Sequence, residues 1–201
     1  METIDHVDIL FANHNGKYFS QPLLHQHGAE VQEFGALRLF PIALAADARI
    51  ESCQLLNHIL ADSIILYSLY KKHHWLMRGN TFYQLHLLLD KHAGEQLELV
   101  DLLAERIQTL GGVAIADPRH VAEVTTVPRP PNGAEEVPAM LSRLLEAHEI
   151  TIAKIRDAIG RTAENRDDGT NDLLMGDLLR RHELQVWFIA EHLVDTPTVR
   201  V

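Results

Sequence analysis

Two pairs of potential metal ligands lie along one stretch of the sequence, and the residues of each pair are four positions apart. His86 and Asp90 form the first pair, and Asp101 and Glu105 form the second. Residues four apart share one face of an α-helix, so each pair presents its two donors together. Imidazole and carboxylate groups suit ferrous iron among other divalent ions. The alternative is that these are ordinary polar residues on a helix surface.

A single helix cannot bring both pairs to one metal ion. Asp90 and Asp101 point to within roughly 20° of each other, but they lie roughly 16 Å apart along the axis, at about 1.5 Å per residue. First-row metal ions hold their ligands at only about 2.0–2.3 Å. Two copies of the helix, antiparallel across a two-fold axis, would place the first pair of one chain against the second pair of the other. His74, at the end of the preceding helix, can complete each of the two sites.

The elements that must position these ligands are predicted to be helices. From about Ala45 to Met77, apolar residues recur every three or four positions, which is typical of a buried helix face. Residues 79–81 break this helix, and Thr81 is a candidate cap for the next one. That second helix is predicted over 82–110, where a Gly pair ends it.

A long connection follows, with four prolines and a possible short helix near 118–124. A third long helix is predicted over 133–165, and a fourth over 171–194 after a turn with a Thr cap. We therefore expect an all-α four-helix bundle at residues 41–195, with an N-terminal arm at 1–40 and a C-terminal tail at 196–201.

Composition narrows the class of protein. The chain has 201 residues, 46% of them hydrophobic, and a formal net charge of −10. An acidic chain repels the phosphates of DNA, and the first twenty residues hold a single lysine, Lys17. Cys53 is the only cysteine, so no intrachain disulfide can form. The N-terminus lacks a signal pattern and the most apolar run is too short to span a bilayer, so we expect a soluble, cytoplasmic protein.

The stretch "HHWLMRGNTFYQLHLLLD", followed by "ELVDLLAERIQTLGG", resembles the Dps family, the DNA-binding proteins from starved cells or mini-ferritins. The last helix, "DDGTNDLLMGDLLRRHELQVWFIAEHL", is also similar to that family, so the resemblance covers about residues 45 to 194. The first forty residues are longer than in minimal members. The elements at the family spacing are His74-Trp75, Gly79, Phe82, Leu85-His86, Asp90, Asp101, Ala104-Glu105-Arg106 and Leu110-Gly111.

The resemblance implies that the four-helix bundle is ferritin-like, with a ferroxidase centre shared between two subunits of a homo-oligomer, a hollow dodecamer. Members oxidise ferrous iron, preferably with hydrogen peroxide, and store ferric iron, which protects against oxidative stress. Zinc or manganese are alternative metals. Trp75 is expected beside the centre. By resemblance, the metal and catalytic ligands are His74, His86 and Asp90 from one subunit, with Asp101 and Glu105 from its partner.

Several alternatives stay open. True ferritins use Glu-x-x-His on two helices, a motif this chain lacks, so a di-iron centre inside the bundle is not expected. Rival functions are a nucleoid-associated, DNA-protecting structural protein with secondary iron binding, and a scaffold that buffers zinc or manganese without redox chemistry. The N-terminal arm either carries a second metal site, formed by His25 and His27 with Glu30 or Glu33, or binds no metal. The acidic residues Glu146, Glu149 and Asp157 either line a pore for iron entry or belong to a solvated helix face.

Overall fold

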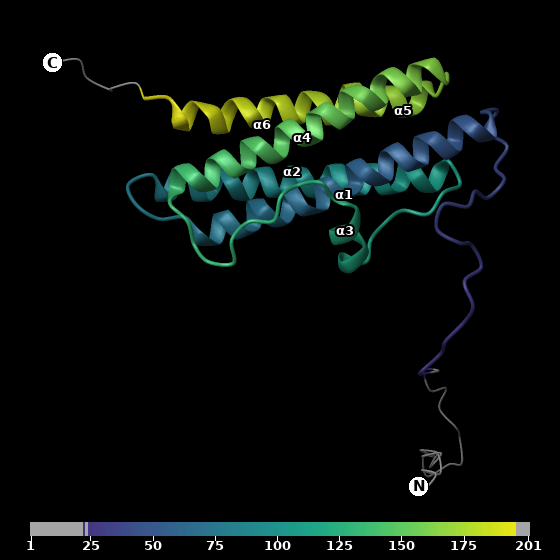
Figure 1. Cartoon of the computed structure of the whole chain (residues 1–201), viewed down its shortest axis with the longest axis horizontal. Coiled ribbons are helices and arrows are strands. Elements are labelled where there is room, and N and C mark those ends of the chain that lie inside the picture. Colours follow the sequence, from purple (N-terminus) through teal and green to yellow (C-terminus); the bar gives the residue numbers. More distant parts are fainter. Residues whose placement is uncertain (1–21, 23, 196–201) are drawn as a thin grey trace, which may run out of the picture. The chain divides into compact units, whose positions relative to one another are not determined.

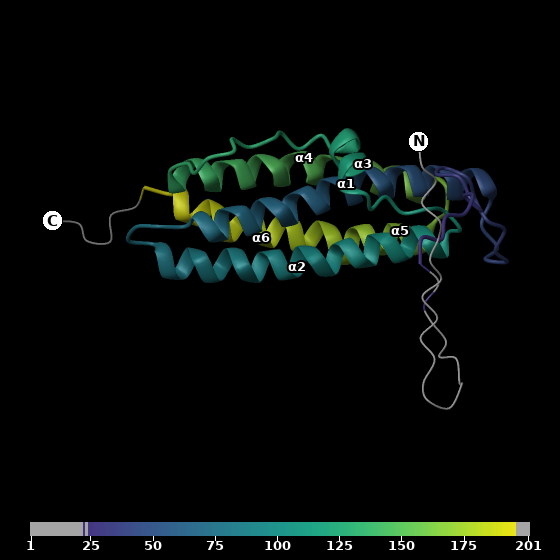
Figure 2. The ribbon, with the colours of Figure 1, turned by 90° about the horizontal axis from the view of Figure 1, so that it is seen from below.

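The structure, a computed structural model, describes residue 22 and residues 24–195. Four long helical segments lie side by side (Figures 1 and 2). The first three are α1 (Ala46–Leu76), α2 (Phe82–Thr109) and α4 (Val137–Glu164), and α3 (Pro118–Val124) is a short helix in the connection before α4. Within the described ranges there is no strand, and the predicted all-α, ferritin-like four-helix bundle is confirmed.

The fourth segment is not one regular helix. It consists of α5 (Asp168–Leu173), a π-helix η1 (Leu174–Leu179), α6 (Arg180–Ala190) and a final 3₁₀ turn η2 (Glu191–Leu193). The segment starts three residues earlier than predicted, because the Asp167 carboxylate caps it by accepting the Thr170 N–H at 3.2 Å. The predicted Thr cap is wrong, since Thr170 lies inside the helix. The side chain of Thr81 likewise makes no capping bond to α2.

The Gly pair after α2 allows the chain to turn closely over α1. Gly111 has φ +87°, a left-handed conformation that favours glycine, and a Cβ there would collide with the backbone oxygen of Arg38. A Cβ on Gly112 would lie 2.6 Å from Cys53 Sγ. Arg38 donates its N–H to the Gly111 carbonyl at 2.8 Å, and Arg49 Nε donates to the Leu110 carbonyl at 2.8 Å. These bonds hold the segment before α1 against the end of α2.

The interior contains two hydrophobic clusters with polar residues between them along the helices. One cluster includes Leu60, Leu103 and Ile155, and the other includes Leu89 and Leu144. In α2, α4 and the fourth segment, buried polar side chains fall in sequence between the stretches that supply the two clusters, namely Gln96, His148, Thr151, His182 and Gln185.

The chain divides by contacts into residues 1–31 and residues 32–201. The bundle, with α1 packed most extensively against α2, belongs to the second unit. None of the described helices is long and apolar enough to cross a membrane.

Candidate metal centre

The end of α1 and the start of α2 hold two histidine rings in contact. The rings of His74 and His86 stack with their centroids 3.8 Å apart and an angle of 21° between their planes. His74 Nδ1 lies 2.8 Å from the backbone oxygen of His86, and His86 Nδ1 lies 3.0 Å from the backbone oxygen of His74. A carbonyl oxygen only accepts, so both Nδ1 atoms must carry the proton.

These reciprocal bonds fix the tautomer of both rings. With Nδ1 protonated, each neutral imidazole carries its free lone pair on Nε2, the atom that can bind a metal ion. The Phe82 ring packs on His86 with centroids 5.0 Å apart and further fixes its plane. His74 is nearly buried at 9% exposure, so its orientation is set by the protein. The pair therefore presents two Nε2 lone pairs from rings whose orientation the protein fixes.

A carboxylate completes this cluster. Asp90 Oδ1 lies 3.9 Å from His74 Nε2, and the same oxygen accepts a hydrogen bond from Lys71 Nζ at 2.5 Å. That bond and the charge of Lys71 hold the pKa of the Asp90 carboxyl below its usual range, so Asp90 is ionised at neutral pH. Lys71 occupies the position of a cation beside Asp90. An arriving metal ion would compete with it.

Trp75 follows the ligand His74 and is 70% exposed. Lys71 Nζ lies 5.8 Å from the centre of its indole ring, which is a cation–π contact. Trp75 is therefore connected to the cluster through Lys71, which also bonds Asp90.

Asp101 and Glu105 lie further along α2, and both are exposed. Asp101 lines a shallow groove on the surface of α2, together with Gly94, Leu97, Glu98, Val100 and Ala104. The structure does not bring Asp101 or Glu105 to the histidine pair within one chain. Among the described residues, no group of three or more His, Cys, Asp or Glu side chains closes around a metal position.

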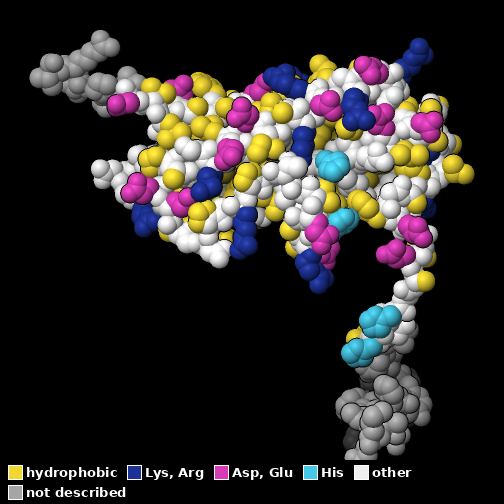
Figure 3. Space-filling view, in the orientation of Figure 1, with side chains coloured by type: hydrophobic (Ala, Val, Ile, Leu, Met, Phe, Trp, Pro, Cys, Tyr) yellow, Lys and Arg dark blue, Asp and Glu magenta, His cyan; other side chains and the backbone are white. Residues whose placement is uncertain are grey.

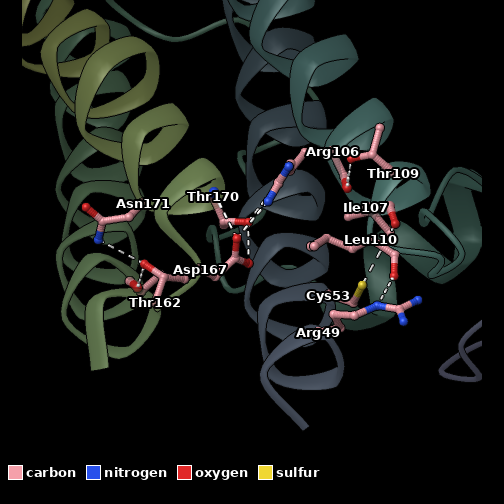
Figure 4. A network of polar contacts seen from close by, with 11 residues as sticks. Arg49, Cys53, Arg106, Ile107, Thr109, Leu110, Thr162, Asp167, Thr170 and Asn171 are labelled. Atoms are coloured by element: carbon pink, nitrogen blue, oxygen red, sulfur yellow. Dashed lines mark hydrogen bonds and ion pairs between the residues drawn. The ribbon is translucent and has the colours of Figure 1, made fainter. Parts of the chain in front are cut away.

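The end of α2 next to Glu105 is fixed by a buried network (Figure 4). Arg106 donates to Asp167 Oδ1 at 2.7 Å and to Thr170 Oγ1 at 2.9 Å. Asp167 is 2% exposed, so its ion pair with Arg106 is largely shielded from water. These bonds tie α2 to α5 and hold Arg106 inward, while Glu105 stays exposed.

Two histidines with no usable sequence pattern are connected in the interior. His148 on α4 and His182 on α6 are fully buried, and their Nδ1 atoms lie 2.9 Å apart. Tyr70 Oη lies 2.5 Å from His148 Nε2. The only sequence signal is that each histidine follows a buried leucine by four residues, Leu144 before His148 and Leu178 before His182.

The remaining candidates are not gathered into a site. No metal-holding group in the described part of the chain includes His25 or His27. Glu146, Glu149 and Asp157 are all exposed on α4, and Asp157 lies 3.8 Å from Arg161 one turn later. His73 and His92, next to the ligands in sequence, are instead buried in the bundle.

Known proteins match this chain in sequence and in fold. A ferritin-like domain model matches residues 53–199. The solved structure of DpsC from Streptomyces coelicolor is 69% identical with a TM-score of 0.85, covering 86% of this chain and 100% of that one. A Dps homologue from the archaeon Halobacterium salinarum is 27% identical with a TM-score of 0.82, covering 86% of this chain and 96% of that one. The chain belongs to the Dps family of ferritin-like proteins.

A sequence relative supports the same membership in this family. The nutrient stress-induced DNA-binding protein of Synechococcus sp. is 31% identical over 163 residues, which cover 81% of this chain and 92% of that protein. This Dps-family chain thus has two histidines and one carboxylate at the α1–α2 end. Two further carboxylates lie about three turns away on the same helix.

Proposed function

We propose that this Dps-family chain oxidises ferrous iron at centres shared between two subunits. The observation that carries the proposal is the pair of reciprocal bonds between His74 and His86, which present two Nε2 lone pairs beside the ionised Asp90. A carboxylate beside them supplies the negative charge that ferrous iron prefers.

A second copy of the chain would supply the remaining ligands. Across a two-fold axis, Asp101 and Glu105 of one subunit would face the His86 and Asp90 pair of the other. The outer face of α1 and α2 also carries large exposed apolar side chains, a feature of surfaces that bind another protein. They are Trp75 and Tyr83, each 70% exposed, and Leu97, 53% exposed.

The proposed reaction uses ferrous iron as substrate and hydrogen peroxide as oxidant. Two ferrous ions each give up one electron, peroxide accepts both and its O–O bond breaks, and the oxygen atoms leave as water after protonation. The ferric product would be stored in a hollow dodecamer built from the two-fold dimers. Zinc or manganese can compete for the same nitrogen and oxygen donors.

A mixing experiment tests the shared centre. One variant carries His86→Ala and Asp90→Ala, and the other carries Asp101→Ala and Glu105→Ala. Each alone has every centre damaged, and we expect fast iron oxidation to be lost in both. When the two are unfolded together and reassembled, a mixed dimer has one centre with all its ligands and one that keeps only His74, so part of the activity should return.

The matched control carries Gln84→Ala and Gln108→Ala, two exposed polar residues on α2 that the proposal does not use. It should oxidise iron at the wild-type rate. If mixed dimers are proven by mass spectrometry and no activity returns, the centre is not shared. If either homogeneous variant keeps fast oxidation, its two residues are not ligands.

The rival function, DNA protection by direct binding, has less support. Lys and Arg residues are interspersed with Asp and Glu over the face shown in Figure 3 and form no continuous basic patch there. The net charge of −10 leaves little electrostatic attraction for phosphate. Lys17 and Arg200 lie outside the described residues.

A further inference from the structure

The connection between α3 and α4 contains an Asn-Gly pair, Asn132–Gly133, which the proposed function does not use. Both residues are exposed and lie in a bend outside the helices. Glycine has no Cβ to keep a neighbouring side chain away from its amide nitrogen. In the described part of the chain, no atom lies within 4 Å of the point where a Cβ on Gly133 would stand, apart from its immediate neighbours. There is therefore room for the five-membered ring that an asparagine side chain can form with the next amide nitrogen.

The backbone on both sides of Asn132 is held by one ammonium group of α1. Lys72 Nζ donates to the carbonyl oxygen of Pro131 at 2.6 Å and to that of Gly133 at 3.2 Å. Two carbonyl groups that flank one residue can converge on a single cation only if the chain between them curves. On the N-terminal side, Pro130 and Pro131 have fixed φ angles, which restrict the motion of the connection. The bend at Asn132 is thus part of the folded protein.

The side-chain amide of Asn132 is polarised by a neighbouring cation. Arg129 Nη2 donates to Asn132 Oδ1 at 2.9 Å. The bond draws electron density from the Cγ carbon, and it places a positive charge where a negative oxygen forms when Cγ is attacked. Within residues 24–195, no hydrogen bond from the Gly133 N–H is found, so this nitrogen is not engaged elsewhere. An activated electrophile and an unengaged nucleophile are therefore adjacent in the chain.

The other asparagines in the described ranges lack this arrangement. Asn57 and Asn171 lie inside helices, and hydrogen bonds tie their side-chain amides to other segments. Asn80 and Asn165 are followed by threonine and arginine, whose side chains crowd the next amide nitrogen. The exposed bend, the following glycine and the bonded carbonyl oxygen come together at Asn132.

We propose that Asn132 is a self-modification site, at which the chain converts this asparagine to aspartate and isoaspartate with assistance from Arg129. The Gly133 nitrogen gives its proton to water and attacks Asn132 Cγ. The bond from Cγ to the side-chain nitrogen then breaks, and ammonia leaves after taking a proton from water. The product of this step is a cyclic succinimide. The inference does not rest on the proposed function, because the reaction uses neither iron nor peroxide.

Water completes the reaction by opening the ring at one of its two carbonyl groups. Opening at the side-chain carbonyl restores the normal backbone and gives aspartate. Opening at the backbone carbonyl leaves the chain connected through Cγ and gives isoaspartate. In sum, the asparagine and one water become an acidic residue and one ammonia, with no change of oxidation state. Each conversion adds one negative charge next to Arg129.

The two products differ in their effect on the contacts of Lys72. Aspartate leaves the backbone unchanged, so both carbonyl bonds to Lys72 persist. Isoaspartate passes the backbone through the side-chain methylene, which inserts one more carbon before Gly133. The carbonyl oxygens of Pro131 and Gly133 then cannot both keep their present distances from Lys72 Nζ. Formation of isoaspartate therefore releases the connection from α1.

Ageing of the metal-free, assembled protein in warm neutral buffer tests the modification. Peptide mass spectrometry follows the replacement of the side-chain amide by a carboxyl group, and electron-transfer fragmentation separates isoaspartate from aspartate. We expect both products at Asn132 and none at Asn57 or Asn171. The same dipeptide occurs at Asn15–Gly16, outside the described residues, and it serves as an internal comparison. Conversion of Asn15 in a protein whose Asn132 stays intact would overturn the proposal.

The role of Arg129 is tested with Arg129→Met. Its matched control is Arg119→Met, because Arg119 is an exposed arginine on α3 that contacts Asp117 instead. In the folded protein, Arg129→Met should slow the conversion of Asn132 by roughly tenfold, which is less than the effect of one such donor in a site without water. In urea, both variants should react at the wild-type rate, because the bond to Asn132 exists only in the folded chain. Equal rates of Arg129→Met and wild type in the folded protein would refute the assistance, and so would equal slowing of Arg129→Met in urea.

Hydrogen exchange of residues 129–136 tests the release from α1. Asn132→Asp supplies the new charge without the extra backbone carbon, and its exchange should match that of fresh wild-type protein. The isoaspartate fraction of aged protein should exchange faster over the same residues. Equal exchange in the isoaspartate fraction and in Asn132→Asp would contradict the release.

Discussion

If Asp90 binds a metal ion as proposed, Lys71 competes with that ion, and removal of Lys71 should strengthen metal binding. Lys71 Nζ lies 2.5 Å from Asp90 Oδ1, and the two side chains are 24% and 53% exposed. An ion pair this exposed contributes about 0.2–1 kcal/mol. A metal ion must break it, so Lys71→Met should raise the affinity of the centre by roughly 1.4- to 5-fold, since each 1.4 kcal/mol corresponds to about tenfold in binding.

Anaerobic calorimetric titration with ferrous iron, and separately with zinc, measures this change. The control is Lys72→Met, because Lys72 Nζ donates to the Pro131 and Gly133 carbonyl oxygens instead of to a ligand. Its titration should match the wild type. If Lys71→Met assembles normally but binds metal with the same affinity as the wild type or a lower one, then Lys71 does not compete with metal ions for Asp90.

Three further outcomes are expected. Burial lowers the pKa of His73, His92 and His182 to about 4, so as the pH falls these residues become protonated in the unfolded chain before they do so in the folded protein. The free energy of unfolding should therefore be constant above about pH 6.5 and should fall between about pH 6.5 and pH 4. At pH 5 the three histidines together should lower it by about 6 kcal/mol. Denaturant unfolding of metal-free protein at pH 8 and pH 5 checks this, and equal midpoints would contradict it. Asp62→Ala leaves the Lys154 ammonium and the Thr125 hydroxyl without their buried partner, and it should lower the free energy of unfolding by about 3 kcal/mol. The control Asp157→Ala, on the exposed face of α4, should change it by no more than about 0.5 kcal/mol. Equal losses in the two variants would show that the buried bonds of Asp62 do not stabilise the fold. Plasmid DNA should not be retarded in a gel at about 0.1 M salt without magnesium, and a clear shift would reveal a basic patch among the residues outside the described ranges.

Helix positions are largely predictable from periodicity and from Gly. The short helix Pro118–Val124 has the predicted bounds, and α1 and α2 end within one residue of prediction. The third long helix is predicted to begin at residue 133 but begins at Val137. Lys72 donates hydrogen bonds to the carbonyl oxygens of Pro131 and Gly133, and Arg78 donates one to the carbonyl oxygen of Glu135. These bonds hold the residues before α4 outside the helix. Sequence periodicity contains no information about such partners from another helix.

The ligand types and their spacing are determined by the sequence alone, because residues four apart always share one face of a helix. A metal site that used both pairs would require a second chain, since one helix keeps the two pairs about three turns apart. Only the tertiary structure decided that His74 and His86 exchange Nδ1–H bonds with each other's carbonyl oxygens. It alone brought together Tyr70, His148 and His182, which are 34 to 112 positions apart in the chain. A hydrogen bond depends on where two helices cross and on a turn such as η1, and both are set by the packing of the whole core.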